Sequence, residues 1–405
     1  MSEPAPAAPK RLFTYDFSVL LAAAAFGFCN IAVFYGFASY LERLGVAPAW
    51  RGWLLGAEPL AAVCLRPFLS ILVTPRNALA LARVSLVCMG LALCGYLFAQ
   101  GIGPIVAVRL FHGASFVCLV SAVTVMLARA IPPGLSGRAF GLFSLSALVP
   151  YAIMPPMAEW LLARLGREDR VYAVCSVLVL PGLALLAPLG RRLGGRAMAA
   201  VAGTRRPSLA AVRRTVSLTP VRLILAANLC LFLSVTPVFF FIRPFAQDVG
   251  LADPGLFFTV STVASIAMRL FGGAYYDRLP KAAVLVAALA CLAACMAGFA
   301  ATAENIRLLV LAGAYGLCLG VAMPLGNAVM YGCSPPAMRG TTLNLMLFMM
   351  DVGYVLGPVA AGAVLASGAG YPALYIACGG FALAAGGLAT PLAVADWRER
   401  AGRRP

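Results

Sequence analysis

Five of the ionisable side chains within the long apolar stretches of this chain of 405 residues are candidates for a functional role. Arg66 and Asp351 are two of them, and Glu58, Arg109 and His112 form a second group in which the last two share one helix face. Burial favours the neutral form of a carboxyl group, a nearby arginine favours its charged form, and a histidine titrates near neutral pH. These residue types are typical of sites that take up a proton or bind an anionic group. The alternative is a permanent neutral pair that only holds helices in register.

The surrounding sequence predicts helices that cross a membrane. Hydrophobic residues make up 62% of the chain, against about 45–50% in soluble domains, and the mean hydropathy is +0.93. The apolar stretches run for roughly twenty residues, the length that spans a bilayer core of about 30 Å. We therefore expect an all-α polytopic membrane protein with twelve transmembrane helices. The expected spans are 17–41, 52–74, 78–99, 104–130, 139–163, 171–190, 221–246, 254–276, 282–302, 306–331, 341–366 and 371–394.

The distribution of positive charge predicts the topology. The formal net charge is +17, and most lysines and arginines lie in alternate loops, as the positive-inside rule predicts. The segment 191–220 holds seven arginines and no acid, so we expect a cytoplasmic linker that lies against anionic lipids. Both termini are then cytoplasmic, and the protein lies in the inner (plasma) membrane. This distribution argues against a nucleic-acid partner.

Several chemistries find no support in the sequence. Nearly all of the twelve cysteines lie in apolar spans, where they serve as small packing residues, and one histidine argues against a Cys/His metal site. The chain contains no phosphate-binding loop and no Gly-x-Ser-x-Gly motif. We therefore expect no metal, no cofactor and no enzymatic activity.

The two halves of the sequence repeat one another at an offset of 203 residues. LRPF at 65–68 aligns with MRLF at 268–271, and Gly113 aligns with Gly316. Six spans repeated after a basic linker predict two parallel six-helix bundles with pseudo-symmetry about the membrane normal. We divide the chain into an N-terminal bundle, a linker and a C-terminal bundle, at 1–190, 191–220 and 221–405.

Four motifs, on this repeat, resemble those of the major facilitator superfamily. They are GAYYDRLPK at 273–281, VRLFHGASF at 108–116, the matching PPGLSGRAFG at 132–141 and PPAMRGTTLN at 335–344, and DVGYVLGPVAAG at 351–362. The resemblance covers nearly the whole chain. It implies that spans 1, 4, 7 and 10 line a central cavity, and that spans 2, 5, 8 and 11 form the interface between the bundles.

The resemblance also places the candidate residues. It puts span 2 beside span 11, so we expect Arg66 to pair with Asp351 across the interface. The expected cavity-lining residues are Asn30, Tyr35, Ser115, Asn228, Tyr315, Met323 and Asn327. Because span 8 abuts span 5 in the family, we expect a cytoplasmic gate in which an acid on one side meets a base on the other. Its residues are Asp277, Arg278, Arg138 and Gly273.

The function implied by the resemblance is secondary active transport of a small molecule by alternating access. Polar lining groups are few and phenylalanine is plentiful, so we expect proton-coupled efflux of a lipophilic or amphiphilic compound. We also expect the protein to be a monomer. Proton-linked uptake of a small organic anion is the alternative, because of Arg109 and Arg243, although Arg243 near the end of its span is expected to snorkel. A non-transporting receptor on the same scaffold is a third possibility.

Overall fold

The computed structural model describes residues 13–131, 136–189, 208–250, 253–276 and 279–401, and these residues form helices and turns with no strand. The helices, with short 3-10 segments written η, are α1 (Tyr15–Ala32), η1 (Val33–Gly36), α2 (Phe37–Arg43), α3 (Pro48–Leu72), α4 (Ala78–Gly95), α5 (Ile102–Ala130), α6 (Ser136–Leu165), α7 (Glu168–Cys175), η2 (Ser176–Leu178), α8 (Val179–Leu186), α10 (Leu209–Val216), α11 (Thr219–Asp248), α12 (Gly255–Tyr276), α13 (Lys281–Ala300), α14 (Asn305–Cys333), η3 (Pro336–Met338), α15 (Arg339–Ala366) and α16 (Gly370–Ala401).

Local sequence signals explain several helix ends. The hydroxyl of Thr14 accepts a hydrogen bond from the backbone N–H of Phe17 at 3.3 Å, and Ser208 accepts one from Ala211 at 3.2 Å. Each bond satisfies a donor that the first turn of a helix leaves without a partner. After α6 the backbone turns at Gly166, whose φ of +70° lies in the left-handed region that glycine adopts without strain.

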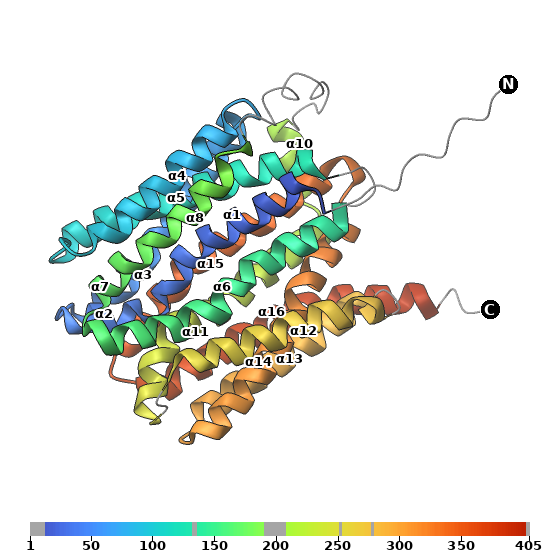
Figure 1. Ribbon diagram of the computed structural model, residues 1–405. Helices are drawn as coiled ribbons and strands as arrows, with labels where there is room; N and C mark the ends of the chain where they lie inside the picture. The colour runs from blue at the N-terminus through green and yellow to red at the C-terminus, as the bar shows by residue number, and fades with distance from the viewer. Residues whose placement is uncertain (1–12, 132–135, 190–207, 251–252, 277–278, 402–405) are drawn as a thin grey trace.

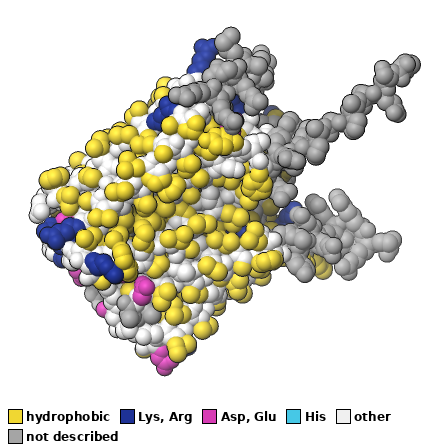
Figure 2. Space-filling model, viewed as in Figure 1, with side chains coloured by type: hydrophobic (Ala, Val, Ile, Leu, Met, Phe, Trp, Pro, Cys, Tyr) yellow, Lys and Arg dark blue, Asp and Glu magenta, His cyan; other side chains and the backbone are white. Residues whose placement is uncertain are grey.

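Eleven helical runs in the described residues are long and apolar enough to cross a membrane. The runs Tyr15–Arg43 and Glu168–Leu186 each continue through a 3-10 segment. The expected span at 52–74 corresponds to α3, which carries Glu58 and Arg66, is not one of the eleven, and packs along α5 and α15. Hydrophobic side chains cover the side of the bundle in Figure 2, and charged side chains gather near its ends. The fold is that of a polytopic membrane protein, as the sequence predicts.

The helices lie roughly side by side, and the bundle has two distinct ends (Figure 1). α1 begins and α16 ends at one of them, which we call the terminal end. The opposite end, near α2 and α7, is called the far end. The sequence predicts that the terminal end faces the cytoplasm.

The internal repeat is confirmed in the helix bounds and in the packing. α5 and α14 occupy 102–130 and 305–333, so both bounds differ by 203. A Cβ at Gly113 would meet the backbone carbonyl of Glu58, and one at Gly316 would meet that of Ser261, which lies 203 residues after Glu58. In each half, therefore, the backbones of two helices touch where glycine leaves room. The division at 1–190, 191–220 and 221–405 stays a prediction.

The two most extensive helix contacts between the halves are equivalent in the repeat. α3 packs along α15, and α12 packs along α6. A Cβ at Gly52 would meet the carbonyl of Pro358, and a Cβ at Gly255, 203 residues later, would meet the backbone of Pro156. The two contacts are therefore equivalent in the repeat, and both lie near the far end.

Candidate functional site

Arg66 and Asp351 form an ion pair between α3 and α15. The Nε atom of Arg66 lies 2.5 Å from Oδ2 of Asp351, and the two side chains are 23% and 7% exposed. Glycine on the facing surface of α3 makes this approach possible, since Gly56 lies against the carbonyl of Val355, one turn from Asp351. The contact that the sequence predicts is present, and its role in transport stays a prediction.

Arg109 is almost completely buried beside Glu58. Its Nη2 atom donates to the carbonyl oxygen of Leu55 at 2.9 Å and lies 4.0 Å from Oε2 of Glu58. The guanidinium also lies over the rings of Phe34 and Phe37, with its carbon 5.0 and 4.6 Å from the ring centroids. Aromatic faces stabilise a desolvated cation, so Arg109 is held by packing as well as by charge.

His112 is enclosed by aromatic side chains. Its ring centroid lies 5.3 Å from that of Phe34 and 6.5 Å from that of Tyr96. Neither ring nitrogen has a hydrogen-bond partner among the described residues. The surroundings of His112 are therefore those of a packed aromatic residue, and proton loading through it stays a prediction.

The seven expected cavity-lining residues have different surroundings. Three donate a side-chain hydrogen bond to a backbone carbonyl: Asn30, Ser115 and Asn228. Such bonds satisfy the side chain within the helix bundle and leave less capacity for a ligand.

The remaining four face other side chains or an open surface. Tyr35 donates its hydroxyl hydrogen to Glu159, and the ring of Tyr315 packs against aromatic neighbours. The sulfur of Met323 accepts a hydrogen bond from Nη2 of Arg269. Asn327, one helical turn further along α14, is exposed. Met323 and Asn327 therefore offer a ligand more than the other five.

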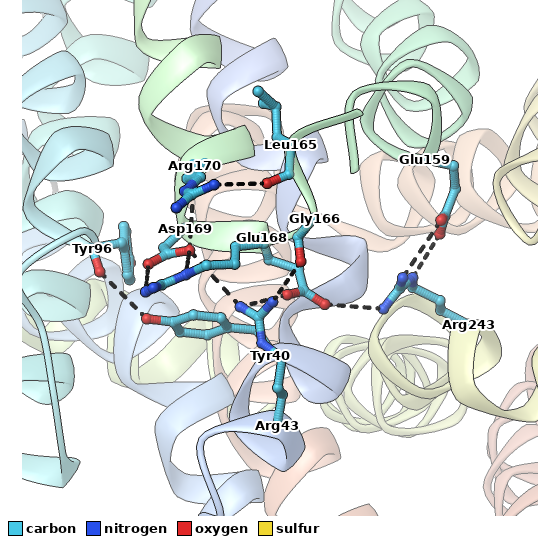
Figure 3. Close-up of polar contacts among 11 residues, drawn as sticks. Tyr40, Arg43, Tyr96, Glu159, Leu165, Gly166, Glu168, Asp169, Arg170 and Arg243 are labelled. Carbon is cyan, nitrogen blue, oxygen red and sulfur yellow. Dashed lines mark hydrogen bonds and ion pairs between the residues drawn. The ribbon is translucent and has the colours of Figure 1, made fainter. Parts of the chain in front are cut away.

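A network of charged residues that the sequence did not predict joins the halves near the far end (Figure 3). The Nε atom of Arg243 donates to Oε1 of Glu159 at 2.6 Å, and its Nη1 lies 3.6 Å from Oε1 of Glu168. Tyr35 donates to the same oxygen of Glu159. The expectation that Arg243 snorkels to the surface is wrong, because its side chain is only 5% exposed. The end of α11 packs against η1 and α2, and Glu159 of α6 and Glu168 of α7 pair with the charge of Arg243.

The network continues towards α2 (Figure 3). The Nη2 atom of Arg43 lies 2.6 Å from Oε2 of Glu168, and the Nη2 atom of Arg167 lies 2.5 Å from Oδ2 of Asp169. Glu159 is the member that sequence reasoning should have found, because it is a lone acid within the expected span 139–163, the criterion that identified Asp351.

The predicted gate on the cytoplasmic side lies largely outside the described residues. Asp277 and Arg278 are not among them, and neither the side chain of Arg138 nor the burial of Gly273 is described. In the part of the chain that is described, no group of three or more His, Cys, Asp or Glu side chains is arranged to hold a metal ion.

Two repeated sets of helices with ion pairs between them are an architecture found in many membrane transporters. A sequence profile of the Major Facilitator Superfamily matches residues 17–303 and 224–404. The chain belongs to this superfamily. It is a secondary transporter of a small molecule and not an enzyme. Among curated proteins no match to the sequence is found.

Several solved structures share the fold of this chain. The nucleoside transporter NupG has 15% sequence identity and a TM-score of 0.76, over 94% of this chain and 99% of that one. A POT family transporter in complex with a thioalcohol-conjugated peptide has 12% identity and a TM-score of 0.69, over 92% and 93%. A POT family transporter in complex with 5-aminolevulinic acid has 11% sequence identity and a TM-score of 0.69, over 94% of this chain and 95% of that one. At such identities the likeness shows the fold alone.

Proposed function

We propose that this protein is a proton-coupled transporter that exports a lipophilic or amphiphilic small molecule. The observation that carries the proposal is the ion pair between Arg66 and Asp351. It links α3 of one half to α15 of the other, deeper in the helices than the far-end network. A proton that binds Asp351 removes the charge that attracts Arg66, so protonation and the separation of the halves at this point are coupled.

The far-end network supports the same cycle. With Arg243 bound to Glu159 and Glu168, the halves are joined at the far end. Alternating access requires these contacts to break when the other end closes. Release of the central pair by a proton and breakage of the far-end pairs are then steps of one rigid-body movement.

Aromatic side chains from both halves support a lipophilic substrate. The ring of Phe239 on α11 lies 5.5 Å from Tyr151 on α6 and 5.7 Å from Phe258 on α12. Phe258 in turn lies 5.5 Å from Tyr35, near the end of α1. These rings come from four different spans and meet between the halves, which is where a transporter of this kind binds its substrate.

The proposal includes the setting of the protein. The arginines of the segment 191–220 favour a terminal end in the cytoplasm, against anionic lipids of the inner (plasma) membrane. The protein acts there as a monomer.

Proton-linked uptake of an organic anion is the second candidate function. It is favoured by Arg269, a guanidinium on α12 that faces a methionine sulfur and no acid among the described residues. Both candidates use the same fold, and they differ in substrate charge and in the direction of flux.

The test is flux in proteoliposomes driven by a pH gradient of either sign. Purified protein is given a panel of fluorescent cationic dyes and labelled aromatic carboxylates, and movement of each is measured from pH 5 to pH 8. We expect gradient-driven movement of at least one amphiphile by the wild type. Asp351→Asn is expected to abolish the dependence of the rate on pH. Glu304→Gln, which replaces an exposed acid at the N-cap of α14, is expected to keep it.

The outcomes separate the classes. Flux of any solute excludes a non-transporting receptor, and its direction relative to the gradient distinguishes efflux from uptake. If Asp351→Asn transported with the pH dependence of the wild type, Asp351 would have no part in coupling.

A further inference from the structure

The repeat gives Arg66 a twin in the second half. Adding the offset of 203 to position 66 gives 269, and both positions hold arginine. The acid that binds Arg66 is Asp351, and its equivalent, 351 minus 203, is Leu148 on α6. One half of the repeat therefore supplies an arginine without the matching carboxylate.

The helices that carry the two arginines make an equivalent contact in each half of the repeat. α12 packs along α6 as α3 packs along α15. The hydroxyl of Thr259 on α12 donates to the carbonyl oxygen of Ala152 at 2.7 Å. At the equivalent place in the other pair, Gly56 lies against the carbonyl of Val355. The two helix pairs therefore share a repeated contact, and the acid present in one pair is absent from the other.

Arg269 has unused hydrogen-bonding capacity. Its one hydrogen bond among the described residues runs from Nη2 to the sulfur of Met323, at 3.5 Å, and sulfur is a weak acceptor. Its Nε atom is buried and has no partner there. A guanidinium presents five donors, and leaving them unsatisfied inside a membrane protein is costly. An intramembrane charge of this kind is by default a candidate for a functional role.

The side chain is on the helix face that looks between the halves. Phe258 and Arg269 are eleven residues apart, which is close to three helical turns, so they share one face of α12. Phe258 lies on the inner side, because its ring contacts Tyr35 and Phe239 from other spans. The exposed side chains Val263 and Leu270 lie on another face of the helix, about 100° or more from Arg269.

We propose that Arg269 binds the carboxylate of an amphiphilic organic anion, the substrate of this transporter. The planar guanidinium donates two parallel hydrogen bonds to a carboxylate, a geometry that lysine cannot reproduce. The aromatic rings lie roughly 16 Å along the same face of the helix, so only a long apolar body reaches them from a carboxylate on Arg269. Asn327 on α14 is exposed one turn from Met323. This inference rests on the proposed function, because the bound anion is a substrate only if the protein transports it.

The test measures binding and needs no flux. Thermal unfolding of the full chain in detergent is followed with benzoate, octanoate or inorganic phosphate, and with the neutral amides benzamide and octanamide, at constant ionic strength. A ligand at 100 times its Kd that binds only the folded protein lowers the unfolding equilibrium constant about 100-fold. We expect benzoate or octanoate to raise the Tm of the wild type, and the amides to leave it unchanged.

Three variants locate the effect. Arg269→Met removes the charge at similar length and is expected to abolish the response to carboxylates. Arg269→Lys keeps the charge without the paired donors, so its response is weaker. Leu148→Asp places an acid where the repeat has Asp351, so it pairs with Arg269 and displaces the ligand. Without ligand, each variant must elute as a single species with a cooperative unfolding transition.

Each other result overturns the inference. Absence of a carboxylate response in the wild type, an undiminished response in Arg269→Met, or a response to inorganic phosphate alone contradicts binding of an amphiphilic carboxylate at this residue. If Arg269→Met does not fold, the response of Leu148→Asp decides. If the carboxylate response is absent but a pH gradient drives flux of a cationic dye, only the anion site is refuted. If no solute moves at all, the proposed function is refuted.

Discussion

Replacing Arg243 with methionine should open the far end of the bundle. The substitution keeps an apolar chain of similar reach and removes the cation that Glu159 and Glu168 share. Among the described residues Glu159 then keeps only the hydroxyl of Tyr35, and a buried carboxylate without its cation is strongly unfavourable. The contact between α11 and the first half loses its polar attachment, and the equilibrium between closed and open far ends shifts towards the open state.

The magnitude follows from the burial of the pair. The side chains of Arg243 and Glu159 are 5% and 16% exposed, and their closest atoms are 2.6 Å apart. Removing one partner of a buried pair costs about 3–5 kcal/mol. Glu168 retains Arg43 at 2.6 Å, so the lower value applies, and about 3 kcal/mol corresponds to a roughly hundred-fold change in the equilibrium.

Hydrogen–deuterium exchange of the protein in lipid nanodiscs measures this shift. In Arg243→Met the amides of 33–43 and 240–248 should exchange up to about a hundred-fold faster, while those of α13 stay unchanged. The matched control is Arg164→Met, since Arg164 lies over Trp160 and donates to its carbonyl within the same helix, α6. Wild-type exchange in both segments of a folded Arg243→Met protein would refute the role of the network. Glu159→Gln provides a second, milder variant.

Two further predictions concern packing and charge within the bundle. Gly316→Ala places a methyl group against the backbone of Ser261, so it should lower the free energy of unfolding by about 1–3 kcal/mol. Gly332→Ala is the control, because open space surrounds Gly332 and the substitution should not lower stability. Equal Tm values for the two variants would contradict the close approach of α12 and α14. Arg66→Met leaves Asp351 buried without its partner and should cost about 3–5 kcal/mol, while the double variant Arg66→Met with Asp351→Leu should recover most of that loss. Additive losses in this double-mutant cycle would show that the two side chains do not interact.

The helices were predictable because their signals are local or repeated. Apolar length marks each span, and the offset found at Gly113 and Gly316 reappears as matching bounds of α5 and α14. The contact between Arg66 and Asp351 was also within reach, because two lone charges in apolar spans need partners and the resemblance put those spans side by side. The expected span at 52–74 shows the limit of apolar length as a signal, since Glu58 and Arg66 dilute its hydropathy.

The far-end network was not predictable in the same way. Arg243 and Glu159 are 84 residues apart, and their pairing depends on how α6 and α11 are rotated about their axes. The position of Arg243 near a helix end suggested contact with water, yet neighbouring helices cover that end. His112 illustrates the same difficulty, because no local pattern shows that Phe34 and Tyr96 enclose it.

The shared register of the two interfaces has a consequence for the order of the chain. α8 ends and α11 begins at the end of the bundle where α1 begins and α16 ends, because each half consists of an even number of spans. A circular permutant that starts at Thr219 and joins the old termini would keep both helix pairs, α3 with α15 and α6 with α12, in place. The chain connection between the halves then serves to hold them near each other, while the residues of each half determine the shape of the interface.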